Sequence, residues 1–168
     1  MAESSRLATQ LAGLPGSYRP DVAVIVVGGN DVTHRVPVAD SVRHLTEAID
    51  DLRARGAEVV VGTCPDLGAL RSVSQPLRAL GSRASRQLAE AQWVTALDRG
   101  ARAMSLAHVV GPFFISNPEE MSSLDRFHPS AHGYKRTAKA VLPSVLAALG
   151  VVQEVPFGYH APDVGGSG

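Results

Sequence analysis

The sequence has little cysteine, no excess of charge of either sign and no long apolar run. Cys64 is the only cysteine among 168 residues, so the chain cannot form an internal disulfide or a zinc site of several thiolates. Sixteen basic residues balance sixteen acidic ones, which argues against nucleic acid as a partner. The longest apolar run, Val22–Val27, is far too short to cross a bilayer, and we expect no stable membrane insertion.

The length and composition indicate one globular domain. Hydrophobic residues make up 45% of the chain and charged residues 19%, which are ordinary values for a folded protein. No basic segment followed by an apolar run comes after Met1, so we expect a cytoplasmic chain; a secreted longer form would need its export signal upstream of Met1. We predict one domain over residues 1–150 and a flexible tail over residues 151–168, which ends in glycine and serine.

Short apolar segments alternate with longer segments of helical periodicity. The pattern predicts strands at Val22–Val27, Glu58–Gly62 and Ala101–Leu106, and helices at Val38–Arg55, Leu77–Asp98 and Ala131–Leu149. Gly81 is a possible interruption of the second helix, and residues 107–127 read as a loop rich in Gly, Pro, Asn and Ser. The alternation is typical of an α/β fold with three α/β/α layers and a parallel sheet, whose chemistry gathers at the carboxyl ends of the strands.

The segment Asp125-x-x-His128-Pro-Ser precedes the last predicted helix. A carboxylate three residues before a histidine can accept a hydrogen bond from Nδ1–H, which fixes the tautomer so that Nε2 can take a proton from a nucleophile. The same residues would also suit a plain helix N-terminus, in which Asp125 and Ser130 cap backbone amides. The segment alone leaves both interpretations open.

A second segment, Gly28-Gly-Asn30-Asp31, follows the first predicted strand directly. An asparagine amide at that place can donate a hydrogen bond to a developing oxyanion, and Gly28 would let the backbone approach a substrate. A simple turn is the other interpretation, since Gly and Asn tolerate positive φ. The segment lacks the spaced glycines of a dinucleotide fingerprint and the Gly-Lys-Ser/Thr of a P-loop.

Together, Gly28-x-Asn30-Asp31 and Asp125-x-x-His128-Pro-Ser resemble two of the four sequence blocks of the SGNH hydrolases, the GDSL-type esterases and lipases. The resemblance covers about residues 18–149 and implies a flavodoxin-like α/β fold that hydrolyses a small-molecule ester or thioester through an acyl-enzyme. It implies that His128 is the general base and Asp125 its orienting acid. Asn30 and Gly28 would belong to the oxyanion hole, and Asp31 would steady the turn. No metal or organic cofactor is implied.

The chain departs from the family pattern at the nucleophile. No Gly-Asp-Ser occurs in the sequence, so no serine of that block is present, and the second family block, a glycine, is also missing. Residues 3–14 resemble the helix that precedes the Gly-x-Asn-Asp strand, so the sequence is expected to begin partway through the fold, without its first two strands. Val22–Val27 would then be an apolar edge strand, which predicts poor solubility or a homodimer through that edge.

Three alternatives remain open at this point. The chain is expected to be inactive alone, so a non-catalytic binding or interaction module is the competing function. Cys64, at the end of the second strand, would be a thiol nucleophile if its surroundings activated it, although a lone cysteine is more often a small buried hydrophobe. Asp125, His128 and His132 would form a metal site if Pro129 allowed both imidazoles onto one face.

Overall fold

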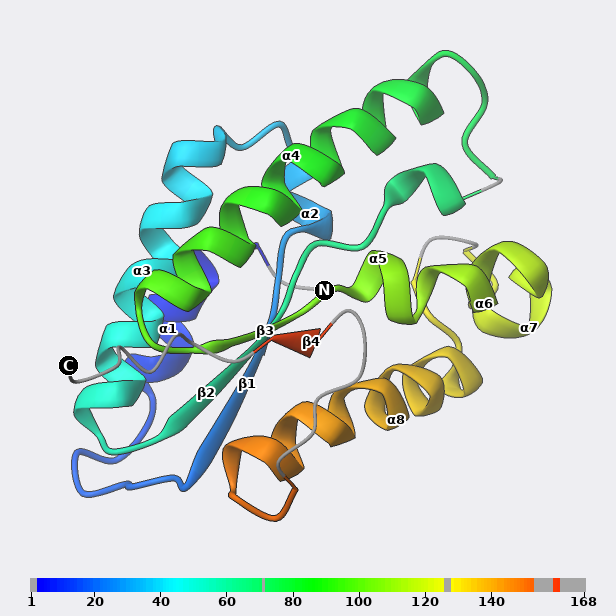
Figure 1. Cartoon of the computed structure of the whole chain (residues 1–168). Coiled ribbons are helices and arrows are strands. Elements are labelled where there is room, and N and C mark those ends of the chain that lie inside the picture. Colours follow the sequence, from blue (N-terminus) through cyan, green and yellow to red (C-terminus); the bar gives the residue numbers. More distant parts are fainter. Residues whose placement is uncertain (1–2, 71, 126–127, 153–158, 161–168) are drawn as a thin grey trace, which may run out of the picture.

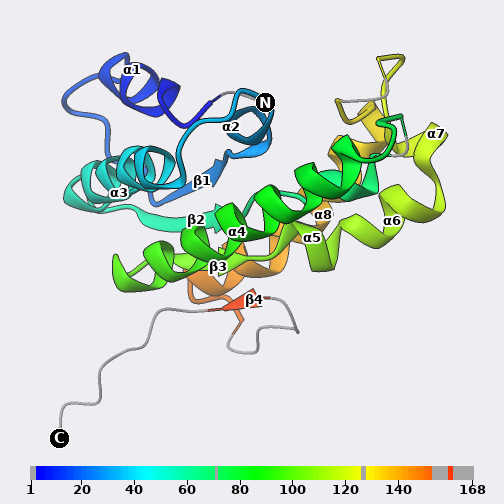
Figure 2. The same ribbon diagram turned by 90° about the horizontal axis from the view of Figure 1, so that it is seen from above.

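The chain folds into three layers, with helices on both faces of a central sheet (Figures 1 and 2). The structure is a computed structural model that describes residues 3–70, 72–125, 128–152 and 159–160. Strands β1 (Val22–Val26), β2 (Glu58–Gly62) and β3 (Arg102–Met104) are parallel and adjacent in that order. A short strand β4 (Tyr159–His160) pairs antiparallel with β3. The predicted α/β class and the parallel sheet are therefore confirmed.

The central strand β2 is apolar along most of its length because both of its faces are covered. The side chains of Val59 and Val61 on β2 point into one core, and that of Val60 points into the other, and all three are fully buried. Such strands read as continuous β-branched runs rather than alternating ones. The register pairs Val22 with Glu58 and Val60 with Arg102, so the three carboxyl ends lie at one edge of the sheet.

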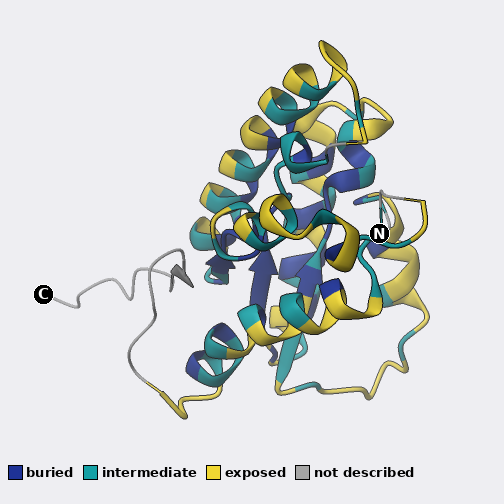
Figure 3. Cartoon of the chain, turned by 90° about the vertical axis from the view of Figure 1, so that its right-hand side faces the viewer, coloured by how far each residue is buried: buried dark blue, intermediate teal, exposed yellow. Residues whose placement is uncertain are grey.

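One face of the sheet is covered by helices α1 (Arg6–Ala12), α3 (Val38–Ala54) and α4 (Leu77–Asp98). Leu45, Ile49 and Leu52 recur on one side of α3 and are buried against the sheet, as their spacing predicts. The prediction for α4 is correct in both bounds, and the helix runs through Gly81 without interruption. Figure 3 shows the outward sides of the helices exposed and the strands buried between the layers.

The other face is covered mainly by α8 (Ala131–Ala148), which begins where the sequence predicted. Ser130 is its N-cap, since its Oγ accepts a hydrogen bond from the Gly133 amide at 3.1 Å. Gly150, at φ 72°, follows the helix as the expected stop. Within the described part of the chain, no helix is long and apolar enough to cross a membrane.

The prediction of a loop over residues 107–127 is wrong. The segment contains helices α5 (Leu106–Val109), α6 (Gly111–Ser116) and α7 (Pro118–Met121). Pro112 and Pro118 lie in the first turns of α6 and α7, where proline is tolerated because its missing N–H has no partner there. Each of these helices is too short to show a helical period in the sequence, and their Gly, Pro, Asn and Ser content is typical of a loop.

Strand β1 lies at the edge of the sheet among the described strands. Val24, whose side chain lies on the same face of the sheet as those of Val22 and Val26, is 45% exposed. A cavity of about 430 Å³ runs along the strand, bounded by β1 itself and by side chains such as Leu7, Leu11 and Leu52. The edge position that the sequence predicted for this strand is what the structure shows, and it leaves backbone groups available for pairing.

Candidate active site

Asp125 and His128 form a hydrogen-bonded pair in the segment between α7 and α8. His128 Nδ1 lies 2.6 Å from Asp125 Oδ2, and the His128 amide donates to Asp125 Oδ1 at 2.9 Å. Both side chains are about half exposed. The carboxylate therefore holds the imidazole through its Nδ1 side, with Nε2 on the opposite side of the ring, which is the arrangement that a general base needs. The pair predicted from sequence spacing is present.

The segment that carries this pair is closed by hydrogen bonds between its two ends. The Ser123 amide donates to the His128 carbonyl at 2.8 Å, and the Ser130 amide donates to the Met121 carbonyl at 2.8 Å. Gly133, in the first turn of α8, packs so closely against the end of α7 that an added Cβ would lie 2.3 Å from the Met121 carbonyl oxygen. Only glycine fits at that position, so the first turn of α8 lies directly against the end of α7 and fixes the base of the loop.

The Gly28–Asp31 segment forms the joint between β1 and a short helix, α2 (Gly29–Thr33), where the sequence suggested a turn. Gly28 has φ 124°, and a Cβ there would lie 2.8 Å from the Cβ of Cys64. The glycine is therefore required by its positive φ, as the turn interpretation of the sequence expected, and also by the packing of two strand ends, which the sequence did not indicate.

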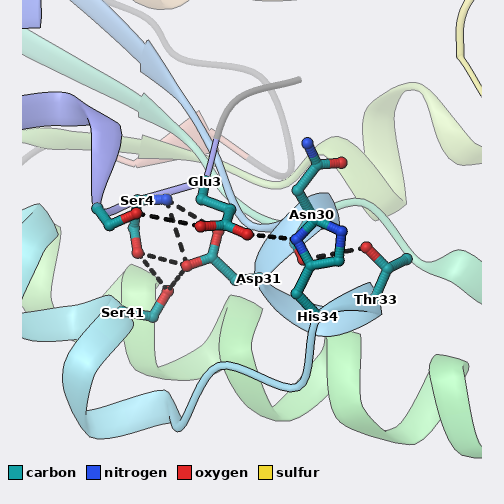
Figure 4. Close-up of polar contacts among 8 residues, drawn as sticks. Glu3, Ser4, Asn30, Asp31, Thr33, His34 and Ser41 are labelled. Carbon is teal, nitrogen blue, oxygen red and sulfur yellow. Dashed lines mark hydrogen bonds and ion pairs between the residues drawn. The ribbon is translucent and has the colours of Figure 1, made fainter.

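Neighbouring residues of α2 point in opposite directions (Figure 4). Asp31 is fully buried and accepts hydrogen bonds from the Ser4 amide at 3.0 Å, from the Ser4 hydroxyl and from the Ser41 hydroxyl at 2.6 Å. Asn30 is half-buried and points away from this cluster. The structural role predicted for Asp31 fits this geometry, and the side chain of Asn30 faces outward at the carboxyl end of β1.

Ser4 and Ser41 were missed by sequence reasoning, as was Gln92. Gln92 is fully buried in the middle of α4, and its side chain joins the ends of two strands. Its Oε1 accepts from the Cys64 amide at 2.6 Å, and its Nε2 donates to the Val27 carbonyl at 3.2 Å. A glutamine on the apolar side of a predicted helix was the available signal, because a buried amide needs partners.

The surroundings of Cys64 do not activate its thiol as a nucleophile. Its side chain is fully buried at the end of β2, and burial, with smaller contributions from Asp31 and Asp66, raises the pKa of the thiol to about 12. The reactive form of cysteine is the thiolate, which this environment suppresses. The buried-hydrophobe interpretation therefore fits, and the thiol alternative does not.

His132 does not join His128 in a shared site. Its Nε2 lies 3.2 Å from Glu120 Oε1, whereas His128 contacts Asp125. Among the residues that the structure describes, no group of three or more His, Cys, Asp or Glu side chains is arranged to hold a metal ion. His128 precedes α8 whereas His132 lies in its first turn, so the two imidazoles do not share a regular helical face.

The two segments of the site lie toward the same end of the sheet. Helix α2 continues directly from the carboxyl end of β1, and α8 begins toward that end and runs back along the sheet (Figures 1 and 2). In an acyl-transfer site, an imidazole that is held by a carboxylate supplies the general base. A side-chain amide at the end of a strand supplies a hydrogen-bond donor to the oxyanion. The fold is of the α/β class, and it places these side chains toward one edge of its parallel sheet.

Residues 2–136 match the GDSL-like Lipase/Acylhydrolase family. The chain is 41% identical over 138 residues to a GDSL-like esterase of Mycobacterium tuberculosis, a match that covers 82% of this chain and 44% of the esterase. The chain therefore belongs to the GDSL-like lipase and acylhydrolase family, and it spans less than half of the length of this relative. Family membership indicates an ester hydrolase by resemblance.

Solved structures of the same fold include known and presumed hydrolases. A mutant of the acetyl-xylooligosaccharide esterase Axe2 from Geobacillus superposes with a TM-score of 0.68 at 16% identity, covering 86% of this chain and 68% of that one. TesA gives a TM-score of 0.61 at 21% identity, covering 86% of this chain and 71% of TesA. A protein described as a possible SGNH hydrolase from Slackia heliotrinireducens gives a TM-score of 0.61 at 23% identity, covering 86% of this chain and 79% of that one. At these identities the likeness establishes the fold.

Proposed function

We propose that the chain supplies the acid–base pair and one oxyanion donor of a serine hydrolase that cleaves carboxylic esters or thioesters. The observation that carries the proposal is the Asp125–His128 pair, with its 2.6 Å contact between Oδ2 and Nδ1. A carboxylate in this position stabilises the imidazolium that forms when Nε2 takes up a proton. Membership of the family supports the same chemistry.

The proposed reaction proceeds through an acyl-enzyme. Nε2 of His128 takes the proton of a serine hydroxyl as its oxygen attacks the carbonyl carbon of the ester. Asn30 donates a hydrogen bond to the resulting oxyanion, and the imidazolium then protonates the leaving alcohol or thiol. Water, activated by the same imidazole, releases the acid. Because the sequence has no Gly-Asp-Ser, the serine must come from a segment outside these residues, and the chain alone should not turn over.

Among the described strands, β1 has one edge without a partner strand, and this edge supports a place for that segment. An extended strand that paired with β1 would end beside Gly28, next to α2. In the absence of such a strand, we propose that two copies of the chain pair through this edge as a homodimer.

A chimera tests the hydrolase proposal. In it, this chain replaces the matching 138 residues of the Mycobacterium tuberculosis esterase, which supplies the rest of the enzyme. We expect the chimera to hydrolyse p-nitrophenyl acetate and the chain alone to remain at background. Replacing His128 by Ala in the chimera should lower kcat by about 10³-fold or more, and Asn30→Ala by about 10²–10³-fold.

Matched variants serve as controls in this experiment. His34→Ala removes an exposed histidine that contacts Glu3, and Asn117→Ala removes another asparagine, and both should leave kcat within about twofold. A folded chimera without activity, or one that stays active after His128→Ala, would contradict the proposal.

The competing function is a binding or interaction module without catalysis. The absence of a Gly-Asp-Ser block and the unpaired β1 edge favour it. The DNA upstream of Met1 separates the two: an in-frame apolar strand that ends in Gly-Asp-Ser supports the hydrolase, and an in-frame stop codon supports the module.

A further inference from the structure

A small apolar cavity of about 110 Å³ lies beside the segment that carries His128. It is bounded by the end of β1, by the short 3-10 helix η1 (Leu67–Ala69) after β2, by α5 and α6, and by the start of α8. Aliphatic and aromatic side chains form most of its wall, chiefly Val26, Leu67, Leu106, Val110, Phe114 and Pro129. Pro129 is the residue directly after His128, so the cavity reaches the loop of the acid–base pair.

A larger cavity of about 550 Å³ adjoins the small one, and the two share Ala69 and Leu70 in their walls. Its wall is more polar and includes Glu119, Ser122 and Ser123. The Ser123 hydroxyl donates to Asp125 Oδ1 at 2.6 Å, so one wall residue of this cavity contacts the acid–base pair directly. Residues 122–124 therefore line the larger cavity and Pro129 lines the smaller one, so that Asp125 and His128 lie in the chain between the two sets of wall residues.

We propose that the small cavity binds the acyl chain of the ester and that the larger one receives the leaving group. This proposal rests on the proposed hydrolase function. A dry apolar cavity of roughly 150 Å³ holds one benzene molecule. In proportion to the six carbons of benzene, the 110 Å³ of this cavity corresponds to about four carbons of an unbranched chain. The substrate class is therefore an ester or thioester of a short acyl group, from acetyl to about butanoyl, with a larger and partly polar leaving group.

Binding of non-hydrolysed alkyl amides tests the cavity without any need for turnover. The chain is titrated with acetamide, propanamide, butanamide, pentanamide and hexanamide, and the methyl NMR signals of Leu67, Leu106 and Val110 report occupancy. Each buried methylene should strengthen binding about fourfold. The affinity should rise up to butanamide and then level off or fall, because the fifth and sixth carbons exceed the cavity.

Two neighbouring phenylalanines of α6 provide a matched pair of variants. Phe114→Leu enlarges the cavity and should move the longest favoured chain toward pentanamide or hexanamide. Phe113→Leu makes the same change at a half-buried residue whose ring lies under Arg136, 3.7 Å from the guanidinium carbon, and should leave the length preference as it is.

The outcomes separate this inference from the hydrolase proposal. Equal affinity along the amide series, unchanged methyl signals at these three residues, or the same effect of both phenylalanine variants would overturn the acyl pocket. An inactive chimera together with a clear length preference in binding would overturn the hydrolase and keep an alkyl-binding cavity. An active chimera that prefers octanoyl esters over butanoyl esters would overturn the acyl pocket and keep the hydrolase.

Discussion

Asp31 shows how a single buried carboxylate can hold together segments that are distant in the sequence. Its hydrogen bonds reach Ser4, 27 residues before it, and Ser41, 10 residues after it. The family resemblance implied that Asp31 steadies a turn, but its partners were not predictable. Serines carry no periodic signal, and only the folded chain brings them to one place.

Replacing Asp31 by Ala should lower the free energy of unfolding by about 3–5 kcal/mol, because it leaves the buried Ser4 amide and two hydroxyls without their acceptor. Chemical denaturation measures the change. Glu47→Ala is the control, since Glu47 is 57% exposed on α3 and should cost within about 0.5 kcal/mol. A loss below about 1 kcal/mol for Asp31→Ala would show that the cluster contributes little.

The buried thiol of Cys64 predicts a pH dependence. Its pKa is raised to about 12, so the thiolate fraction at pH 8 is about three orders of magnitude below that of an exposed cysteine. Labelling of the folded chain by iodoacetamide at pH 8 should be slower than labelling of the denatured chain by about that factor. The denatured chain is its own control, because Cys64 is the only thiol.

The same shift has a consequence for stability. A thiol whose pKa is higher in the folded state than its ordinary value of 9.0 stabilises the fold below that value and loses this contribution as the pH rises toward 12. Cys64→Ala should therefore flatten the decline of stability in this alkaline range, as measured by denaturation at several pH values. Rapid labelling of the folded chain near neutral pH would contradict the buried state of the thiol.

At the scale of elements, the joint between β1 and α2 depends on Gly28. Gly28→Ala should cost about 3–5 kcal/mol, since φ is 124° and the new Cβ would lie 2.8 Å from the Cβ of Cys64. Gly16→Ala is the matched control, because nothing lies within 4 Å of its added Cβ, and it should be neutral or slightly stabilising. Thermal and chemical denaturation of both variants would compare them, and equal stabilities would refute the steric argument.

Elements with a clear period were predictable, and those without one were not. The bounds of β2 and α4 agree with the structure, and those of β1, α3 and α8 differ by one residue, because each has a continuous apolar run or a repeated apolar side. The short helices α5 to α7 lack such a repeat. In the site, the Asp125–His128 contact follows from spacing, whereas the bridge made by Gln92 depends on which strand ends its helix crosses.

At the scale of the whole molecule, the exposed edge of β1 predicts self-association. The chain should form dimers or larger species whose population rises with concentration, measured by light scattering and sedimentation. Val24→Lys places a charge on this edge and should shift the chain to monomer. Val94→Lys makes the same change on the exposed side of α4, where Val94 is 52% exposed. This control variant should leave the self-association of the chain unchanged. A concentration-independent monomer of the unaltered chain would refute the edge prediction.

Backbone hydrogen bonds join the two ends of the loop between α7 and α8 to each other. Only glycine fits at position 133, where α8 packs against the end of α7. The contact between Asp125 and His128 is thus set by short-range contacts between α7, the loop and α8. It should therefore persist when the distant β1 edge of the sheet gains or loses a partner strand.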